Sequence, residues 1–367
     1  MKKERRSFLE IPAVQSILAS ILCIVLGLLI GFIVLLVINP GGAVEGIITI
    51  LKNFWTYPSA AAAKKYFGST LVKTAPLVMC ALSIQLCYKA GLFNIGAAGQ
   101  YVVGAGLSLY AAIAWKLPWF VCLILAMAAG ALWAFFVGML KAYRNVNEVI
   151  SGIMLNWIGL YLVNMLLSTV KEQASPYTIQ VGTANPGGLL PQIQLSKYLS
   201  NNRYVTIAIP LAVFTAILMW FLLNKTVFGY EIRATGLNVN AAKYCGMKEK
   251  KNIVVTLIIG GALAGAGAAF LFLSGYEQWS VTQSAVPAMG FNGIAATFLG
   301  GLDPIGTVFA SYFIQHITNG GAYLDKMIYP SQISDLISSI IIYLCGFVLF
   351  FKMSMNRRIQ AKKGGAR

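Results

Sequence analysis

Long apolar stretches separated by short polar segments make up most of this chain. An α-helix needs about 20 apolar residues to cross a hydrocarbon layer of about 30 Å. Stretches close to that length predict membrane-spanning helices at 15–38, 71–88, 101–115, 119–140, 149–170, 204–223 and 253–274. The stretch 43–68 mixes apolar and polar residues, and we expect it to lie at the membrane interface.

The last third of the chain is apolar but repeatedly interrupted. Between 285 and 313 the pattern contains Pro287, Pro304 and several glycines, which interrupt straight helices. Two short or broken helices that meet near Gly300–Gly306 fit this pattern better than one helix, and 333–351 predicts a final span. The chain is therefore predicted to be an all-α integral membrane protein with about ten transmembrane helices, some of them broken.

Composition supports lipid, rather than water, as the main solvent. Hydrophobic residues make up 58% of the 367 residues and charged residues 11%. Soluble domains carry about 45–50% apolar and about 25% charged residues. So few charges do not cover the surface of a water-soluble globule, which excludes that class.

The net charge of +17 indicates orientation rather than a nucleic-acid partner. The basic residues lie mainly between the apolar runs, where they follow the positive-inside rule. Placing the N-terminus in the cytoplasm puts most of the 28 Lys and Arg on the inside, provided that the number of crossings is even. We therefore expect both termini to be cytoplasmic and expect no nucleic acid to bind.

The predicted organisation is one membrane domain with two short tails. Residues 1–14 form a cytoplasmic tail, 15–352 the transmembrane domain with a polar loop at 224–252, and 353–367 a basic cytoplasmic tail. Gly91-Leu-Phe-Asn-Ile-Gly and Gly290-Phe-Asn-Gly-Ile-Ala occupy equivalent positions if the ten helices form two inverted five-helix halves. Chance recurrence of a short apolar string is the alternative.

The chain offers little material for catalysis, metal binding or proton transfer. It has one histidine, His316, and its acidic residues lie near the predicted ends of spans or outside them. The six cysteines have no metal-type spacing. An ion-coupled carrier usually has an ionisable residue in mid-span, and we interpret His316 as a packed, hydrogen-bonded residue. We therefore predict no catalytic residue, no metal site and an energy source outside this chain.

The polar groups that enter the spans are mostly neutral amides. Asn156 and Asn164 lie on one side of a predicted helix, beside a stripe formed by Trp157, Tyr161 and Asn164. Amides beside aromatic rings suit an uncharged solute that is flat or hydroxylated. The alternative, that these amides hydrogen-bond neighbouring helices together, stays open. The run 260–269, with Gly261 and Gly265, predicts close packing between helices.

Part of the polar loop at 224–252 can form a short helix. Asn238 is a suitable N-cap for residues 239–244, and Gly246 is a suitable stop. A short helix flanked by basic residues can dock in a groove of a soluble partner. A plain solvated loop is the alternative.

Four segments carry a family resemblance. They are 91–100 (GLFNIGAAGQ), 147–156 (NEVISGIMLN), 229–246 (GYEIRATGLNVNAAKYCG) and 290–300 (GFNGIAATFLG). In this order they resemble motifs of ATP-binding cassette (ABC) import permeases of the branched-chain amino acid, simple-sugar and nucleoside group, and their wording is closest to the nucleoside permeases. Ala98 departs from the pattern, which usually has Glu at this position.

The resemblance implies a permease subunit that forms half of a translocation pathway in a bacterial plasma (inner) membrane, and not an enzyme. Partner ATPases would supply ATP and Mg, because this chain has no G-x-x-x-x-G-K-[ST] motif. A second, unlike permease and an extracellular binding protein or lipoprotein are the other implied partners. The predicted ATPase-coupling residues are Glu231, Arg233, Gly236, Asn238, Ala241, Ala242 and Gly246, and the predicted pathway residues are Phe93, Asn94, Gln100, Asn156 and Asn292.

Nucleosides are the predicted solute. A simple sugar, a branched-chain amino acid or, in a different class, transport by an ion-coupled carrier are the alternatives.

Overall fold

The computed structural model describes residues 12–325, 327–329, 336–337, 339–340, 343–344 and 346–364. Within these ranges the regular structure is helical, with three isolated β-bridges between loops. The chain divides into two compact units, one formed by residues 59–294 and the other by residues 1–58 together with 295–367. Each unit is described by itself below.

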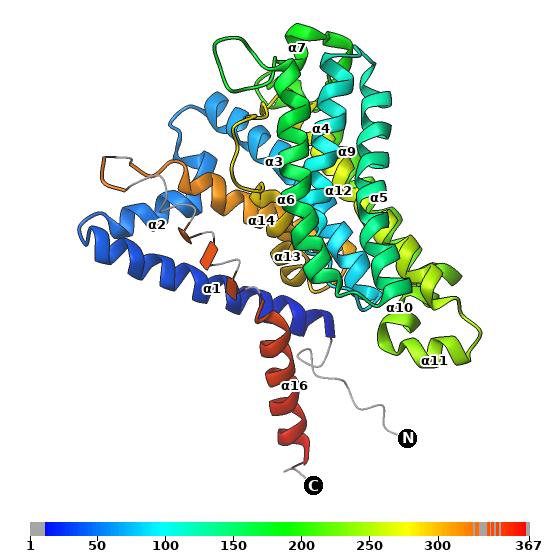
Figure 1. Ribbon diagram of the computed structural model, residues 1–367. Helices are drawn as coiled ribbons and strands as arrows, with labels where there is room; N and C mark the ends of the chain where they lie inside the picture. The colour runs from blue at the N-terminus through cyan, green and yellow to red at the C-terminus, as the bar shows by residue number, and fades with distance from the viewer. Residues whose placement is uncertain are drawn as a thin grey trace. The chain divides into compact units, whose positions relative to one another are not determined.

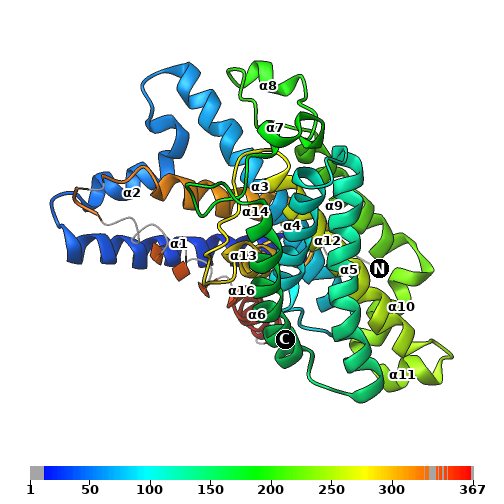
Figure 2. The ribbon, with the colours of Figure 1, turned by 45° about the horizontal axis from the view of Figure 1, so that its top comes forward.

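The larger unit is a helical bundle. Its long helices are α3 (Ala60–Lys89), α4 (Ala97–Ile113), α5 (Trp119–Arg144), α6 (Glu148–Leu167), α9 (Ala208–Lys225) and α12 (Glu249–Phe272). Short helices lie at its two ends: α7 (Val181–Ala184) and α8 (Leu195–Tyr198) at one end, α10 (Val227–Leu237) and α11 (Val239–Tyr244) at the other, as Figures 1 and 2 show.

Helix α12 lies at the centre of this bundle and packs against α3, α4 and α5. Small residues permit the close approach, because a Cβ added to Gly261 would overlap the backbone of Gly130. One turn further on, Gly265 meets the backbone of Ala126 and lies against Gly104 of α4. The close packing predicted from the glycine-rich run is thus confirmed, and it follows from van der Waals contact between backbones rather than from large side chains.

The other unit contains α1 (Pro12–Ile38), α2 (Ala43–Lys52), the 3₁₀ turn η2 (Asn53–Thr56), α14 (Pro304–Gly321) and α16 (Val348–Gly364). Helix α13 (Ala288–Leu299) begins in the larger unit and ends in this one. Within this unit, α1 packs against α2 and α16, and α14 packs against α2 and η2.

The predicted helix break near Gly300–Gly306 is confirmed. Gly300 and Gly306 meet backbone to backbone where α13 ends and α14 begins. Gly301 and Leu302 between them have left-handed backbone angles, with φ of 69° and 59°. The Asp303 carboxylate then caps α14 by accepting hydrogen bonds from the amides of Ile305 (3.0 Å) and Gly306 (3.1 Å).

In the part of the chain that the structure describes, six helices are long and apolar enough to cross a membrane: residues 18–38, 60–89, 119–144, 148–170, 208–225 and 249–272. Helices α4 and α13 are apolar but shorter. The apolar 18-residue stretches of helices 60–89 and 249–272 are 89% and 78% buried, whereas that of helix 18–38 is 22% buried. Large apolar side chains exposed on the outer helices are the expected surface of a multi-pass membrane protein.

The helix predicted at 71–88 begins earlier in the structure. The stretch 43–68, expected at the membrane interface, contains α2, η2 and the first turns of α3, which begins at Ala60. Four alanines at 60–63 favour this helical start, since alanine has the highest helix propensity. Within α3, Lys73 is paired with Glu277 at 3.2 Å, which compensates a charge in an apolar helix. The final predicted span, 333–351, is described only in part, at 336–337, 339–340, 343–344 and 346–351, with α16 beginning at Val348.

Candidate functional site

The two short helices α10 and α11 form the segment from 227 to 246, here called the coupling segment. Thr226 caps α10 by accepting a hydrogen bond from the amide of Gly229 at 3.0 Å. Asn238 joins the helices in an extended conformation, and its side-chain oxygen accepts from the amide of Ala241 at 3.0 Å. Gly246 follows with a φ of 80°, which glycine adopts without strain. The short helix predicted from Asn238 to Gly246 is therefore confirmed.

Apolar side chains stand exposed on the coupling segment, and sequence reasoning missed them. Leu237 is 89% exposed and Tyr244 is 93% exposed. Val227 and Tyr230 are also exposed. Tyr230 and Leu237 follow Val227 by three and ten positions, so the three side chains lie on one side of α10. Exposed apolar side chains of this kind are typical of surfaces that contact another protein or a membrane. The signal was present in the sequence as isolated apolar residues within a polar loop.

The predicted coupling residues differ in where they point. Ala241 is exposed, whereas its neighbour Ala242 is only 3% exposed and packs inward. Arg233 is half-buried, and its Nε donates to the carbonyl of Gly229 at 3.4 Å. Glu231 is half-buried as well, and its backbone carbonyl accepts from the Thr235 hydroxyl at 2.8 Å.

Gly236 ties the coupling segment to the end of α3. A Cβ added to Gly236 would overlap the carbonyl oxygen of Lys89 and lie 2.7 Å from the amide nitrogen of Gly91. Gly91 has a φ of 75° and closes α3, with its amide donating to Tyr88 and the Leu92 amide donating to Cys87, each at 3.0 Å. The motif that opens at Gly91 therefore touches the motif that contains Gly236.

Two of the predicted pathway residues form a buried amide pair after this turn. The Asn94 and Gln100 side chains exchange two hydrogen bonds, Nδ2 to Oε1 at 3.0 Å and Nε2 to Oδ1 at 3.1 Å. Asn94 Nδ2 also lies 3.3 Å from the Ser83 hydroxyl of α3, to which it donates. Both amides are buried, so they link the start of α4 to α3.

Asn156 joins α6 to the same region. Its Oδ1 accepts from the amide of Gly99 at 2.7 Å, and its Nδ2 donates to the carbonyl of Ile95 at 3.1 Å. One turn earlier, Gly152 packs against Gly96, and a Cβ on Gly152 would lie 2.9 Å from the Gly96 amide nitrogen. The structure thus gathers Asn94, Gln100 and Asn156 within one buried polar region, in the manner of amides that hold helices together.

Phe93 and Asn292 lie apart from these hydrogen bonds. Phe93 is half-buried and lines a cavity of about 550 Å³ together with Glu148, Arg233, Gly236 and Leu237, among others. Asn292 is half-buried on α13, two residues after Gly290, and the hydrogen bonds of the buried amides do not include it.

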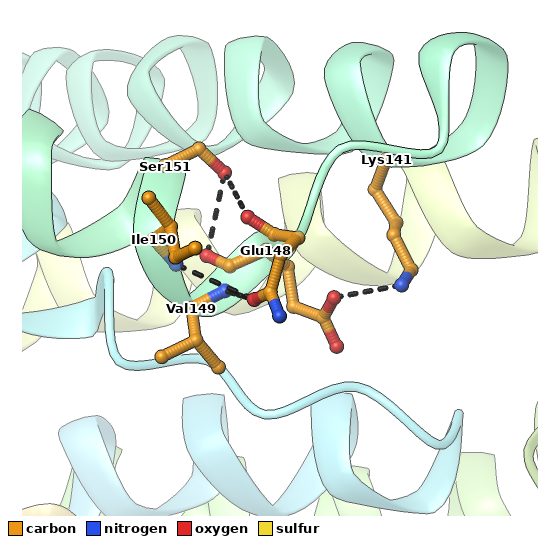
Figure 3. Close-up of polar contacts among 6 residues, drawn as sticks. Lys141, Glu148, Val149, Ile150 and Ser151 are labelled. Atoms are coloured by element: carbon orange, nitrogen blue, oxygen red, sulfur yellow. Dashed lines mark hydrogen bonds and ion pairs between the residues drawn. The ribbon is translucent and has the colours of Figure 1, made fainter.

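The start of α6 is fixed by the second motif of the sequence. The Asn147 side chain caps the helix by accepting from the amides of Val149 (2.8 Å) and Ile150 (3.4 Å). Glu148 pairs with Lys141 of α5 at 2.8 Å, and Figure 3 shows this ion pair beside the capped turn. The motif therefore sets the direction in which α6 leaves the α5–α6 connection.

The middle of α6 exposes aromatic side chains. Trp157 and Tyr161 are exposed and stacked, with ring centroids 6.4 Å apart and planes at 26°. Asn164, which continues the stripe, instead accepts from the indole of Trp279 at 2.9 Å and donates to the carbonyl of Gln283 at 2.8 Å. Exposed Trp and Tyr are typical of membrane interfaces rather than of mid-span positions, so this face suits a protein or solute contact.

The single histidine has a structural role. His316 Nε2 lies 2.9 Å from the carbonyl of Leu51, which only accepts, so Nε2 carries the proton. Nδ1 then accepts from the Asn53 amide at 3.2 Å. These two bonds hold the end of α2 and the start of η2 against α14, and the expected packed, hydrogen-bonded histidine is confirmed. Among the described residues, no group of three or more His, Cys, Asp or Glu side chains is placed to hold a metal ion.

Comparison with known proteins adds to this geometry. Residues 66–346 match the family described as "Branched-chain amino acid transport system / permease component". The guanosine ABC transporter permease protein NupP of Bacillus subtilis is 31% identical, over 97% of this chain and 99% of that protein. The nucleoside ABC transporter permease protein NupB of Lactococcus lactis is 29% identical, over 95% of this chain and 96% of its own. A second guanosine ABC transporter permease protein of Bacillus subtilis, NupQ, is 29% identical over 67% of this chain and 78% of its own.

Proposed function

Because the chain belongs to the branched-chain amino acid transport system / permease component family, and is therefore a permease subunit of an ABC importer rather than an enzyme, we propose that the solute it conducts is a nucleoside. One observation carries this assignment: two proteins similar to this chain over nearly their whole length are named as permeases for guanosine and for nucleosides.

The exposed face of α6 supports the same solute. A purine or pyrimidine ring is flat and stacks on aromatic side chains, and the stacked pair Trp157 and Tyr161 offers such a surface in mid-helix. The side chain of Tyr161 carries a hydroxyl that suits hydrogen bonding to a ribose. We therefore propose Trp157 and Tyr161 as pathway residues alongside Phe93 and Asn292, which the sequence already suggested.

The coupling segment is the proposed docking site for a cytoplasmic ATPase. In this scheme Val227, Tyr230, Leu237 and Tyr244 enter an apolar groove of the ATPase, and Asn238 and Gly246 keep the short helix in shape. Ala241 faces the ATPase, whereas Ala242 packs behind it. The ATPase brings ATP and Mg, and its closure on ATP moves the coupling segment.

Ten crossings in two inverted halves remain the proposed topology, with both termini in the cytoplasm. The six long apolar helices and the two shorter ones account for most of these crossings. The helix break at Gly300–Gly306 and the short helix α13 match the interrupted helices that border pathways in inverted-repeat transporters. The proposed membrane domain is 15–352, between the cytoplasmic tails 1–14 and 353–367.

The proposed assembly contains a second, unlike permease, two ATPase units and an extracellular binding lipoprotein in a bacterial plasma membrane. Similarity to both NupP and NupQ, two permease proteins named for one solute in one organism, supports a pair of unlike permeases. Each permease would then supply half of the pathway.

Uptake of radiolabelled guanosine tests the proposal. Cells that carry the gene are compared with cells that lack it and with cells complemented by it. We expect guanosine uptake to be lost with the gene, restored by complementation, and reduced by excess unlabelled adenosine or uridine but not by glucose or leucine. Competition by glucose or leucine alone would assign the permease to a sugar or to a branched-chain amino acid instead.

A further inference from the structure

The turn 91–96 is clamped at both ends by contacts that leave no room for an added atom. At one end the backbone of Gly236 lies against Lys89 and Gly91. At the other end Gly152 of α6 lies against Gly96. Because backbone meets backbone at each end, side-chain rotation cannot absorb a displacement of one element relative to the next.

Asn156 adds a directional connection to this clamp. The side chain bonds at once to the carbonyl of Ile95, within the turn, and to the amide of Gly99, in the first turn of α4. It is 2% exposed, and both ends of its amide group are used. A solute in a pathway would reach this amide only by breaking bonds that join three segments of the fold.

We infer that the turn 91–96 transmits movement of the coupling segment to α6, with Gly236 and Asn156 as the positioning residues at its two ends. The inference rests on the proposed function, since it requires a motor that acts on α10 and α11. It gives Asn156 a mechanical role in place of solute contact. It also accounts for glycine at positions 236 and 152, where an added Cβ would meet the backbone of Lys89 and of Gly96 respectively.

The ratio of solute transported to ATP hydrolysed measures this connection. The complete transporter, purified from its native membrane and reconstituted in vesicles, is compared with Asn156→Ala, Gly236→Ala and the double variant. We expect each single variant to keep its ATPase, to hydrolyse ATP at close to the wild-type rate, and to lose about tenfold in solute transported per ATP. The KM for guanosine and the preference among nucleosides stay unchanged, because Asn156 does not touch the solute.

Two residues acting in series predict non-additive effects. The double variant is expected to couple no worse than the poorer single variant. Controls are Asn224→Ala, which removes an exposed amide on α9, and Gly187→Ala, a glycine whose added Cβ would meet only the Asn185 side chain, at 3.4 Å. Thermal melting of each variant separates loss of coupling from loss of fold, and Asn156→Ala keeps the inference testable should Gly236→Ala fail to fold.

Three results would overturn the inference. The first is an altered nucleoside preference or KM in Asn156→Ala with normal transport per ATP. The second is coupling losses that multiply in the double variant. The third is normal coupling in both single variants. Failure of the proposed function itself is seen separately in the wild-type sample, as absence of a co-purified ATPase or of ATP-driven nucleoside uptake.

Discussion

Gly290 of α13 lies directly against Ala98 of α4, so that a Cβ added to Gly290 would be 2.8 Å from the Cβ of Ala98. Two motifs separated by most of the chain therefore meet at a pair of small residues. Ala98 is fully buried. The small side chain at 98 is accordingly part of the packing between α4 and α13 in this protein.

Enlarging Gly290 should destabilise this contact. The methyl group of Gly290→Ala would overlap the backbone of Ala98, and overpacking of this kind costs about 1–3 kcal/mol. We expect a lower melting temperature of the purified transporter. Adding Ala98→Gly should restore only part of the loss, because the added methyl group would still meet the Ala98 backbone. Gly187→Ala is the control, and equal melting of all three variants would contradict the contact.

Adjacent alanines of α11 should respond differently to the same substitution. Ala241→Asp introduces a charge on the exposed side of α11 and should abolish ATPase association and uptake without changing insertion or melting. Ala242→Asp buries that charge, which should lower the free energy of unfolding by several kcal/mol and so reduce the amount of folded protein. Co-purification of the ATPase and thermal melting separate the two effects. An Ala241→Asp variant that retained both its ATPase and its uptake would contradict the proposal that the coupling segment is the docking site.

Leu237 provides an independent test of the docking surface. Its side chain is almost fully exposed, so Leu237→Asp should leave the fold intact while disrupting an apolar groove contact. We expect at least about tenfold less ATPase to co-purify, with unchanged melting of the permease. The matched control is Asn224→Asp, an exposed asparagine at the end of α9 and outside the coupling segment. Equal ATPase recovery from both variants would contradict docking through Leu237.

His316 should matter for stability and not for the energy source. His316→Leu removes the hydrogen bonds that join α14 to Leu51 of α2 and to Asn53 of η2, at a cost of about 1–3 kcal/mol. Uptake by the folded fraction should remain ATP-dependent and insensitive to collapse of the transmembrane pH gradient. If wild-type uptake responded to that gradient and uptake by a normally melting His316→Leu variant did not, His316 would be a proton carrier.

Local signals in the sequence were sufficient for most of the long helices and for some of the helix ends. Apolar length located most of the long helices, and capping chemistry located the short helix from Asn238 to Gly246. Proline and glycine located the break before α14. These features depend on neighbours along the chain, which is why one sequence reveals them.

Tertiary relationships were beyond the same reasoning. Asn156 bonds to residues about sixty positions away, and the sequence left open whether such amides face a solute or each other. Helix α11 is six residues long, too short for a periodicity that would tell Ala241 from Ala242. The early start of α3 was missed because its first turns carry lysines that lower the apolar signal, although alanine favours the helix.

The central claim is that this chain conducts solute and that a separate ATPase supplies the work. It is tested most directly by measuring guanosine accumulation in vesicles that contain either the complete transporter with its binding protein or the permease chains alone. The account predicts accumulation against a gradient only with the ATPase present and Mg-ATP on its side of the membrane. Uphill accumulation by the permease chains alone, driven by an imposed ion gradient, would contradict it.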